Sequence, residues 1–297
     1  MNAVKMHFQR GLRVGAPGWG LEEGEKSLGA DVIYSALFHA SMELYGEALP
    51  GDLRISSGFP FVEDTLFFPR PMLPLKALED ATLRLKWGKA VKELDFLERR
   101  WFLEWLRGGN VDLDRAISSR EDLRKAVRTM TRPRVALDRL DNSSSLYFSS
   151  EQCFRPGSGL FCLVSCPDGT WQKLKALFRF MGETGIGGEK SSGVGCFEAE
   201  FCTVDVPEPG DDGPCVNLAP VIPAIDDIAY LRAYELKERG GWVWSPQAPA
   251  ARKKKVSVIA EGSVFARPVT GRIVNVAPDG WPHEVLRYGL GLYARVG

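Results

Sequence analysis

The sequence predicts an α+β fold in two units, and three observations lead to this prediction. The chain has 297 residues, enough for about two domains, and 44% of them are hydrophobic, enough to bury a sizeable core. Strand-like and helix-like segments follow the order strand, helix, strands, and then strand pair, helix, strands. This order is typical of the ferredoxin-like (RRM-like) arrangement. We therefore expect two ferredoxin-like domains, over 1–140 and 141–297.

The first unit begins with a strand and a helix. Residues 3–14 alternate loosely between apolar and polar side chains, which predicts a strand. Residues 30–45 carry apolar side chains at helical spacing, and Gly46 and Pro50 then end the helix. Prolines punctuate residues 55–74, where we expect short strands.

An insertion is expected in the first unit at about 73–130. Helical patterns cover 89–107 and 121–130, and the second pattern begins at a capping box formed by Ser118 and Glu121. Two helices inside a β-rich region indicate an inserted segment.

The second unit is expected to start at a polar and charged stretch over 131–145, which resembles a seam between domains. A helix is predicted over 171–181 from its apolar spacing. The remaining apolar runs are bounded by turn residues and predict strands. These strands are expected over 146–148, 160–164, 194–206, 256–265, 271–276 and 285–293. The first two of them are expected to pair with each other.

A glycine-rich loop at 185–195 lies between the predicted helix and the strand that follows it. Glycine adopts positive φ and lets a ligand approach the backbone, and successive exposed N–H groups form a concave anion site. A lysine adds positive charge and two serines add hydroxyl donors, so a phosphate is the ligand that this composition predicts. The residues expected to contact it are Gly185, Gly187, Gly188, Lys190, Ser191, Ser192 and Gly193.

Two known nucleotide-binding patterns fit this loop poorly. The P-loop and the dinucleotide fingerprint both run from strand through loop to helix, and here the order is reversed. A plain glycine hairpin without a ligand is the alternative, since glycine runs are ordinary turn material. Glu189 is unexpected at an anion site, so we expect its side chain to point outward or to bond a 2′-hydroxyl or a base amino group.

Composition limits the classes of function. Lysine plus arginine equals aspartate plus glutamate, at 38 each, so any RNA footprint on this chain is expected to be local. Six cysteines form no Cys-x-x-Cys pair and there are three histidines, so we expect no metal and no cofactor. No apolar run reaches about 18 residues, and the N-terminus lacks the apolar core of a secretory signal. We expect a cytoplasmic protein with reduced thiols and no membrane contact.

The order Gly-Ile-Gly-Gly-x-Lys-Ser-Ser-Gly-x-Gly, which begins at Gly185, is similar to the glycine-rich loop of the RAMP superfamily of CRISPR-Cas effector proteins. The chain resembles this superfamily nearly end to end. Within it, Ser-Ser-Gly-Phe-Pro-Phe at 56–61 and Glu-Gly-Ser at 261–263 indicate the subunit that caps the 5′ end of the guide RNA in type III-A (Csm) complexes. The segments 28–37, 56–71, 134–145 and 283–289 also resemble that subunit.

The resemblance implies a non-catalytic RNA-binding subunit of an antiviral ribonucleoprotein. Such a subunit holds the repeat-derived 5′ handle of the crRNA and bridges the large signalling subunit to the backbone RAMP subunits. It meets target RNA only indirectly, through the guide. The insertion at about 73–130 is then the expected thumb, which wedges the guide–target duplex.

Residues outside the loop are also expected to contact RNA. Arginine offers a planar fork to phosphate and stacks on bases, aromatic rings stack on unpaired bases, and polar side chains contact base edges. We expect these roles for Arg132, Arg134, Arg139, Asn142, His7 and Trp19. The alternatives are a solvated arginine cluster, a turn at Asn142 and packing of Trp19 on the domain surface. The basic run at 252–255 is either a solvated face or a contact with RNA or an acidic partner.

The amino-acid sequence leaves two other functions open. A metal-independent endoribonuclease would use a histidine as general acid or base, with Lys190 stabilising charge. His39 or His7 would serve, although His39 lies off the apolar stripe of its helix and fits a structural histidine better. A protein that binds a small phosphorylated ligand is the third possibility, favoured only by the glycine loop.

Overall fold

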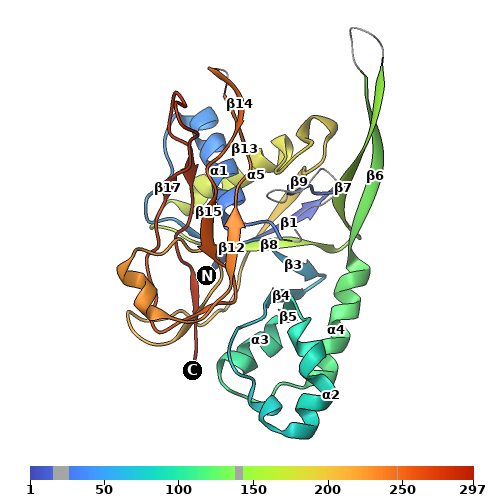
Figure 1. Ribbon diagram of the computed structural model, residues 1–297, viewed down its shortest axis with the longest axis vertical. Coiled ribbons are helices and arrows are strands. Elements are labelled where there is room, and N and C mark those ends of the chain that lie inside the picture. Colours follow the sequence, from blue (N-terminus) through green and yellow to red (C-terminus); the bar gives the residue numbers. More distant parts are fainter. Residues whose placement is uncertain (16–26, 138–142, 246) are drawn as a thin grey trace.

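The computed structural model describes residues 1–15, 27–137, 143–245 and 247–297, and Figure 1 shows the arrangement of its elements. The α+β prediction is confirmed: the described residues form five α-helices and several antiparallel sheets. The main sheet has seven strands, with β2 (Arg54–Ile55) paired beside β3 to β8. In spatial order the other strands are β5 (Phe96–Glu98), β4 (Thr65–Pro69), β3 (Phe59–Val62), β8 (Ser158–Ser165), β1 (Asn2–Phe8) and β9 (Phe197–Thr203).

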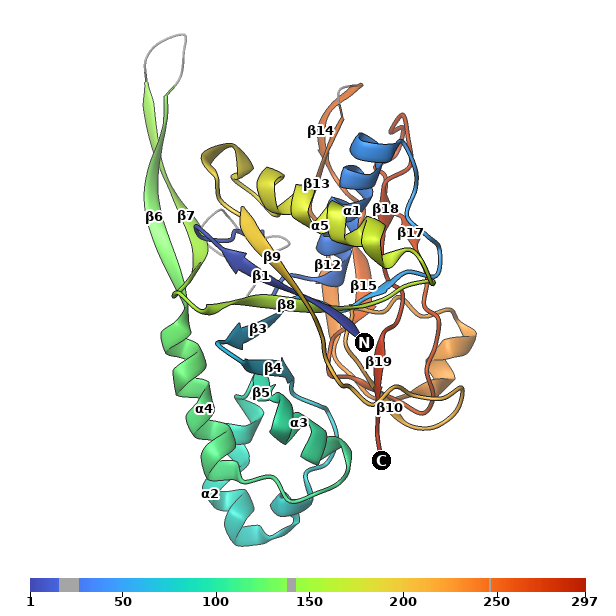
Figure 2. The ribbon, with the colours of Figure 1, turned by 180° about the vertical axis from the view of Figure 1, so that it is seen from behind.

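Two helices pack on each other beside this sheet, α1 (Ala30–Tyr45) and α5 (Trp171–Thr184) (Figure 2). Both agree with the predicted helices. Gly46 ends α1 in the left-handed conformation and its N–H donates to the carbonyl of Met42 at 3.0 Å, as its sequence position predicts. The central strand β8 is buried along seven of its eight residues, so it forms the middle of the core.

The segment between β4 and β8 is longer and more varied than the predicted insertion. It contains α2 (Ala81–Lys92), α3 (Arg99–Leu106) and α4 (Leu113–Ala126), followed by a hairpin of β6 (Val127–Leu137) and β7 (Ser144–Phe154). The helices form a lobe at one end of the molecule, and the hairpin projects at the other end (Figure 1). Eleven residue pairs hold the hairpin in register, from Val127 opposite Phe154 to Leu137 opposite Ser144.

Two helix predictions in this segment were wrong. The helix expected over 89–107 is broken, because Leu97 enters the core in strand β5, which pairs with β4. The helix expected over 121–130 begins earlier, at Leu113, where the carboxylate of Asp112 caps it by accepting from the N–H of Arg115 at 3.1 Å. The proposed capping box therefore lies in the middle of α4.

The expected division at residues 140 and 141 does not separate two sheets. The main sheet contains strands from both sides of that position, and both α1 and α5 pack beside it. Within the polar stretch, residues 131–137 lie in β6 and residues 144–145 lie in β7, so these described parts belong to the hairpin rather than to a seam. The expected pairing of 146–148 with 160–164 was wrong, since β7 pairs with β6, and β8 pairs with β1, β2 and β3.

The C-terminal part of the chain is built from short strands. One sheet has four strands, in the order β11 (Leu231–Ala233), β16 (Val264–Phe265), β10 (Cys215–Asn217) and β19 (Tyr293–Arg295). Three two-stranded pairs complete it: β12 (Leu236–Arg239) with β15 (Val256–Ile259), β13 (Trp242–Ser245) with β14 (Ala248–Arg252), and β17 (Val274–Asn275) with β18 (Leu286–Arg287). Among the described residues after Thr184 there is no α-helix, and the helix expected for the second unit, α5, packs on α1 and on β9 of the main sheet.

Two of the motifs that carried the family resemblance join the C-terminal part to the main sheet. The hydroxyl of Ser57 donates to the carboxylate of Glu261, and the same oxygen accepts from the N–H of Ala30 at 3.1 Å. Gly262 has φ +86°, and a Cβ there would lie 2.4 Å from the carbonyl oxygen of Arg70. Glycine is therefore required at this position by close packing against the end of β4.

Candidate nucleic-acid interface

The glycine-rich loop follows α5 and packs on the segment after β1. The N–H of Gly188 donates to the carbonyl of Arg13 at 2.9 Å, and that of Gly195 donates to Gly11 at 2.9 Å. At Gly195, with φ +84°, a Cβ would lie 2.0 Å from the carbonyl oxygen of Ile186, which is 1% exposed. Glycine is needed here because the loop folds tightly on itself, independently of any ligand.

Most of the loop amides are used inside the protein, so the expected row of bare N–H groups is wrong. Backbone carbonyls accept from the amides of Gly185, Ile186, Gly188, Ser192, Gly193 and Gly195. Among the described residues, no backbone carbonyl accepts from the amides of Gly187, Glu189, Lys190, Ser191 and Val194, and three of these amides are consecutive at the tip. The hydroxyl of Ser192 donates to the carbonyl of Glu189 at 2.8 Å. The tip, with the exposed Lys190, is thus the part of the loop that faces solvent with free donors.

Glu189 does not point outward, contrary to expectation. Its backbone is left-handed, with φ 62°, and its carboxylate lies 3.2 Å from the guanidinium of Arg13 and 3.6 Å from that of Arg134. The acid therefore serves as a counterion to two arginines behind the loop rather than as an obstacle to an anion in front of it.

A second carboxylate continues this chain of charges into the β6–β7 hairpin. Glu151 on β7 is 3% exposed and lies 2.9 Å from Arg134 and 3.5 Å from Arg132. The hydrogen bond that Arg134 donates to Glu151 is the main reason that the pKa of Arg134 lies above its ordinary value. Arg134 is thus held between two acids, whereas Arg132 is 55% exposed and keeps its charge at the surface. The sequence did not single out Glu151, because a buried acid in a polar strand carries no local signal.

One hollow lies between the loop and the β6–β7 hairpin, and we call it the hairpin hollow. Its volume is about 680 Å³, and Phe8, Gln9, Gly11, Pro133, Cys153, Phe154 and Val194 contribute to its lining together with Arg10, Arg132, Arg134, Glu151 and Ser192. Arg10 donates to the carbonyl of Ser192 at 2.8 Å. Arg10 was not among the predicted residues, because the sequence placed it inside a strand over 3–14, whereas β1 ends at Phe8.

A second hollow, the α1 hollow, lies on the other side of the loop, between α1 and the C-terminal hairpins. Its volume is about 340 Å³, and its basic lining residues are Arg13, Lys190, Lys253, Arg287 and His39. Burial lowers the pKa of His39, and the charges of Lys190 and Lys253 lower it further. His39 is therefore neutral at pH 7.

A buried ion cluster closes the floor of the α1 hollow. Asp31 accepts from Arg239 at 2.6 Å and also accepts from Arg287, whose second amino group donates to the carbonyl of Gly240 at 2.7 Å. Burial by itself would raise the pKa of the Asp31 carboxyl, but the charges of the two arginines outweigh burial and hold that pKa below its ordinary value. Among the described residues, the Asp31 carboxylate is shared by two guanidinium groups.

The other predicted contact residues are placed as follows. His7 on β1 lies 2.8 Å from Glu200 and contacts the ring of Phe61 edge-on, and it lines neither hollow. Gly185, Gly187, Gly188 and Lys190 line the α1 hollow, whereas Ser191, Ser192 and Gly193 line a shallow depression beside Arg10. Trp19, Arg139 and Asn142 lie outside the described residues.

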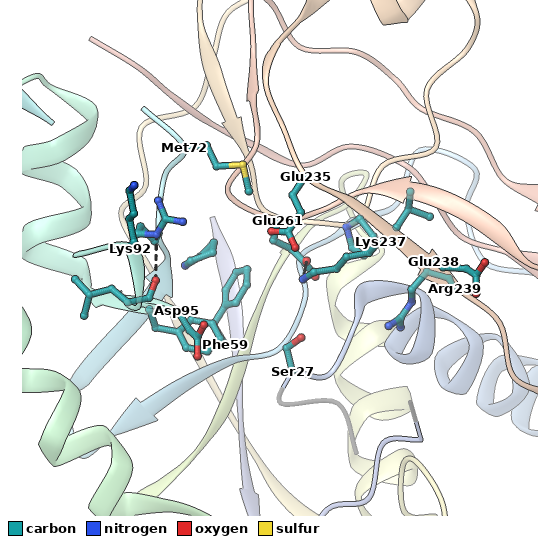
Figure 3. A pocket seen from close by; sticks show the side chains of 16 residues that line it. Ser27, Phe59, Met72, Lys92, Asp95, Glu235, Lys237, Glu238, Arg239 and Glu261 are labelled. Atoms are coloured by element: carbon teal, nitrogen blue, oxygen red, sulfur yellow. Dashed lines mark hydrogen bonds and ion pairs between the residues drawn. The ribbon is translucent and has the colours of Figure 1, made fainter. Parts of the chain in front are cut away.

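A further pocket, of about 660 Å³, lies away from the loop, and Figure 3 shows it from close by. Lys92 and Asp95 lie on one wall, and Lys237 and Glu261 on the other, with 3.2 Å between the ammonium and the carboxylate. Acidic and basic groups are mixed on both walls, so this pocket has no clear attraction for a polyanion.

Comparison with known proteins shows the family. The C-terminal domain of CRISPR Csm4 matches residues 213–296. The chain is 31% identical to the "CRISPR system Cms protein Csm4" of Thermococcus onnurineus (strain NA1), and the alignment covers 88% of this chain and 89% of that relative. A protein with the same description from Mycobacterium tuberculosis (strain ATCC 25618 / H37Rv) is 27% identical over 92% of this chain and 91% of its own.

Solved structures agree on the fold. The chain superposes on a chain of a Csm3–Csm4 subcomplex of the type III-A CRISPR-Cas interference complex with a TM-score of 0.68, at 16% identity and full coverage of both. A Csm1–Csm4 cassette with cA4 gives a TM-score of 0.67, at 24% identity, over 100% of this chain and 97% of the other. The fold and the sequence define a subunit of a type III CRISPR effector. The chain belongs to the Csm4 family.

None of the helices in the described residues is both long and apolar enough to cross a membrane. No cluster of three histidine, cysteine, aspartate or glutamate side chains in the described ranges has the geometry to hold a metal ion.

Proposed function

We propose that this chain is a non-catalytic subunit that holds the 5′ handle of the crRNA in a type III-A effector complex. The observation that carries the proposal is the position of the loop tip between two hollows lined by basic side chains. The handle would lie in the hairpin hollow beside Arg10 and Arg132, cross the tip at Lys190, and enter the α1 hollow beside Lys253. Cations that follow the backbone are what a single strand of RNA requires.

The partners follow from the relatives. Their solved complexes pair Csm4 with Csm1 and with Csm3. We propose that this chain likewise bridges a large signalling subunit and a backbone RAMP subunit, in a cytoplasmic ribonucleoprotein that acts in antiviral defence. The neutral net charge of the chain suits a subunit that gives much of its surface to protein partners.

The fold supports a more specific architecture than α+β. The elements β1, α1, β3, β8, α5 and β9 give the order strand, helix, strand, strand, helix, strand, and their sheet order is β3, β8, β1, β9. We propose that they form one ferredoxin-like unit. The glycine-rich loop then joins the second helix of this unit to its last strand.

We also propose that the thumb is the β6–β7 hairpin rather than the helical lobe. One face of the hairpin is apolar and exposed, with Val135, Leu137, Leu146 and Phe148, whereas Arg132 and Arg134 occupy the other face. Changing Leu137 and Leu146 to serine is expected to alter the nuclease footprint of a guide–target duplex on the assembled complex. An unchanged footprint would assign the thumb elsewhere.

The test of handle binding is Lys190→Ala, with Lys254→Ala as the matched control. Lys254 is a surface lysine whose ammonium lies 2.6 Å from Asp279, and it lines neither hollow. Loss of one charge-assisted contact is expected to weaken RNA binding roughly 5- to 30-fold, or about 1–2 kcal/mol. The slope of log affinity against log salt is expected to fall by about 0.7. Equal affinity and equal salt slope in both variants would refute the proposed role of the loop.

A second candidate function has one specific observation in its favour. The neutral His39 shares the α1 hollow with Lys190 and Lys253, which is a suitable arrangement of base and cations for metal-independent RNA cleavage. It predicts cleavage of a repeat transcript in EDTA that His39→Ala abolishes. A transcript that stays intact after long incubation with the parent protein would refute this second candidate function.

A further inference from the structure

The basic run at 252–255 has different environments at its three lysines. Lys254 pairs with Asp279 and Lys255 pairs with Glu238, each at 2.6 Å. Lys253 instead lines the α1 hollow, and no acid within ion-pair distance is recorded for it in the described part of the chain. Its N–H donates to the carbonyl of Gly241 at 2.9 Å, which fixes its backbone at the base of the β13–β14 hairpin. Only one lysine of the run is therefore directed into the hollow.

A tryptophan forms part of the rim of the same hollow. Trp242, the first residue of β13, is 64% exposed and lines the hollow together with Leu286. Arg252 lies opposite it in the hairpin, with the guanidinium 5.4 Å from the centre of the ring. The guanidinium lies over the indole at cation–π distance, and the exposed part of the ring offers area to a planar ligand. Rings in such positions are the usual platforms for unpaired bases.

The hollow also has an excess of positive charge. Lys190 and Lys253 are without acidic partners among the described residues, and Asp31 is already shared by Arg239 and Arg287. Burial lowers the pKa of Lys253, the charge of Arg287 lowers it further, and Asp31 opposes both only in part. An anion in the hollow would supply the missing counter-charge. Its volume, about 340 Å³, is at the lower end of the range for small-ligand sites.

We propose that the α1 hollow holds one nucleotide of single-stranded RNA, with its base stacked on Trp242 and its phosphate bound by Lys190 and Lys253. This inference rests on the proposed function and specifies where one base of the bound strand leaves the backbone path. The site would prefer a purine to a pyrimidine, because a larger ring system covers more of the indole. It contains no catalytic step.

The test measures binding of a fluorescent oligoadenylate and of an oligouridylate of equal length to the full chain. Trp242→Ala is expected to weaken oligoadenylate binding about 5- to 100-fold, which is the range for loss of one stacked base. Trp242→Phe keeps a ring and is expected to recover most of the affinity. Tyr234→Ala is the matched control, since Tyr234 is an exposed aromatic residue that lines neither hollow. It is expected to bind as the parent does.

Oligonucleotides with a single abasic position distinguish stacking from a change in fold. At the stacked position, removal of the base and Trp242→Ala are expected to be non-additive, because each removes the same contact. Lys253→Ala is expected to weaken every oligonucleotide alike and to lower the salt slope. If Trp242→Ala binds as the parent while Lys190→Ala does not, the nucleotide site is refuted and the proposed function stands. If Lys190→Ala also binds as the parent, the proposed function itself fails.

Discussion

The buried carboxylate of Asp31 is the group whose removal is expected to have the largest effect on stability. Asp31 is almost fully buried and accepts from the guanidinium groups of Arg239 and Arg287, which come from strands β12 and β18. Removing one partner of a buried ion cluster costs about 3–5 kcal/mol, because the remaining charges stay buried without compensation. In Asp31→Asn two guanidinium groups face a neutral amide, with Lys253 nearby as a third cation. We expect a loss of about 3 kcal/mol or more.

Urea unfolding of the full chain, monitored by tryptophan fluorescence and by circular dichroism, measures this loss of unfolding free energy. A loss of 3 kcal/mol corresponds to a Tm lower by about 5 °C for a chain of 297 residues. The pKa of Asp31 is depressed in the folded state, so its contribution is present above the unfolded pKa and is lost as pH falls through the folded pKa. The difference between parent and variant is therefore expected to be constant near pH 7 and to shrink below about pH 4.

Asp279→Asn is the control, because it removes an acid of the same type whose pair with Lys254 is exposed to solvent. It is expected to unfold as the parent does. If Asp31→Asn loses less than about 1 kcal/mol, or no more than the control, the buried cluster does not stabilise the junction between α1 and the C-terminal part.

Two other substitutions test the loop and the hairpin. Gly195→Ala forces a side chain to within 2.0 Å of a carbonyl oxygen at positive φ and is expected to lower the free energy of unfolding by more than about 1–3 kcal/mol. Gly51→Ala, at a position with open space, is expected to change stability little. Urea unfolding compares the two variants, and equal free energies of unfolding would contradict the packing role of the loop glycine. Glu151→Gln removes the shared acid between Arg132 and Arg134 and is expected to cost about 1–3 kcal/mol of local stability and to speed amide exchange in β6 and β7. Unchanged exchange in the hairpin would show that the ion pairs do not hold it.

Local sequence signals predicted the helices that have a single apolar face. In α5 the buried residues Leu174, Leu177, Phe178 and Met181 recur at helical spacing, and Gly46 ends α1 where the pattern stops. The same reasoning failed at 89–107, because a helical pattern does not reveal that Leu97 is needed by a strand of the sheet. Strand pairing is non-local, so the partners of β7 and β8 were not predictable from their own residues.

Side-chain partners explain most of what was missed in the candidate site. Three lysines in a row look alike in sequence, and only the fold shows that two of them meet acids, whereas Lys253 meets none within the described ranges. Sequence also did not identify the tryptophan that stands at a hollow. It suggested Trp19, which lies outside the described residues, and the structure adds Trp242 at the rim of the α1 hollow. The sequence singled out Lys190 because it lies in a loop of unusual composition, and its role in binding stays a prediction.

The amino-acid sequence by itself determined the α+β class, the positions of α1 and α5, the glycine-rich loop and the family, because each depends on neighbouring residues or on a continuous motif. The tertiary structure decided that one sheet crosses the expected domain boundary, that Glu189 turns inward to two arginines, and that basic side chains from distant segments surround two hollows. These outcomes depend on contacts between residues that are from about fifty to well over a hundred positions apart. No local pattern encodes such contacts, since they form only when the chain packs.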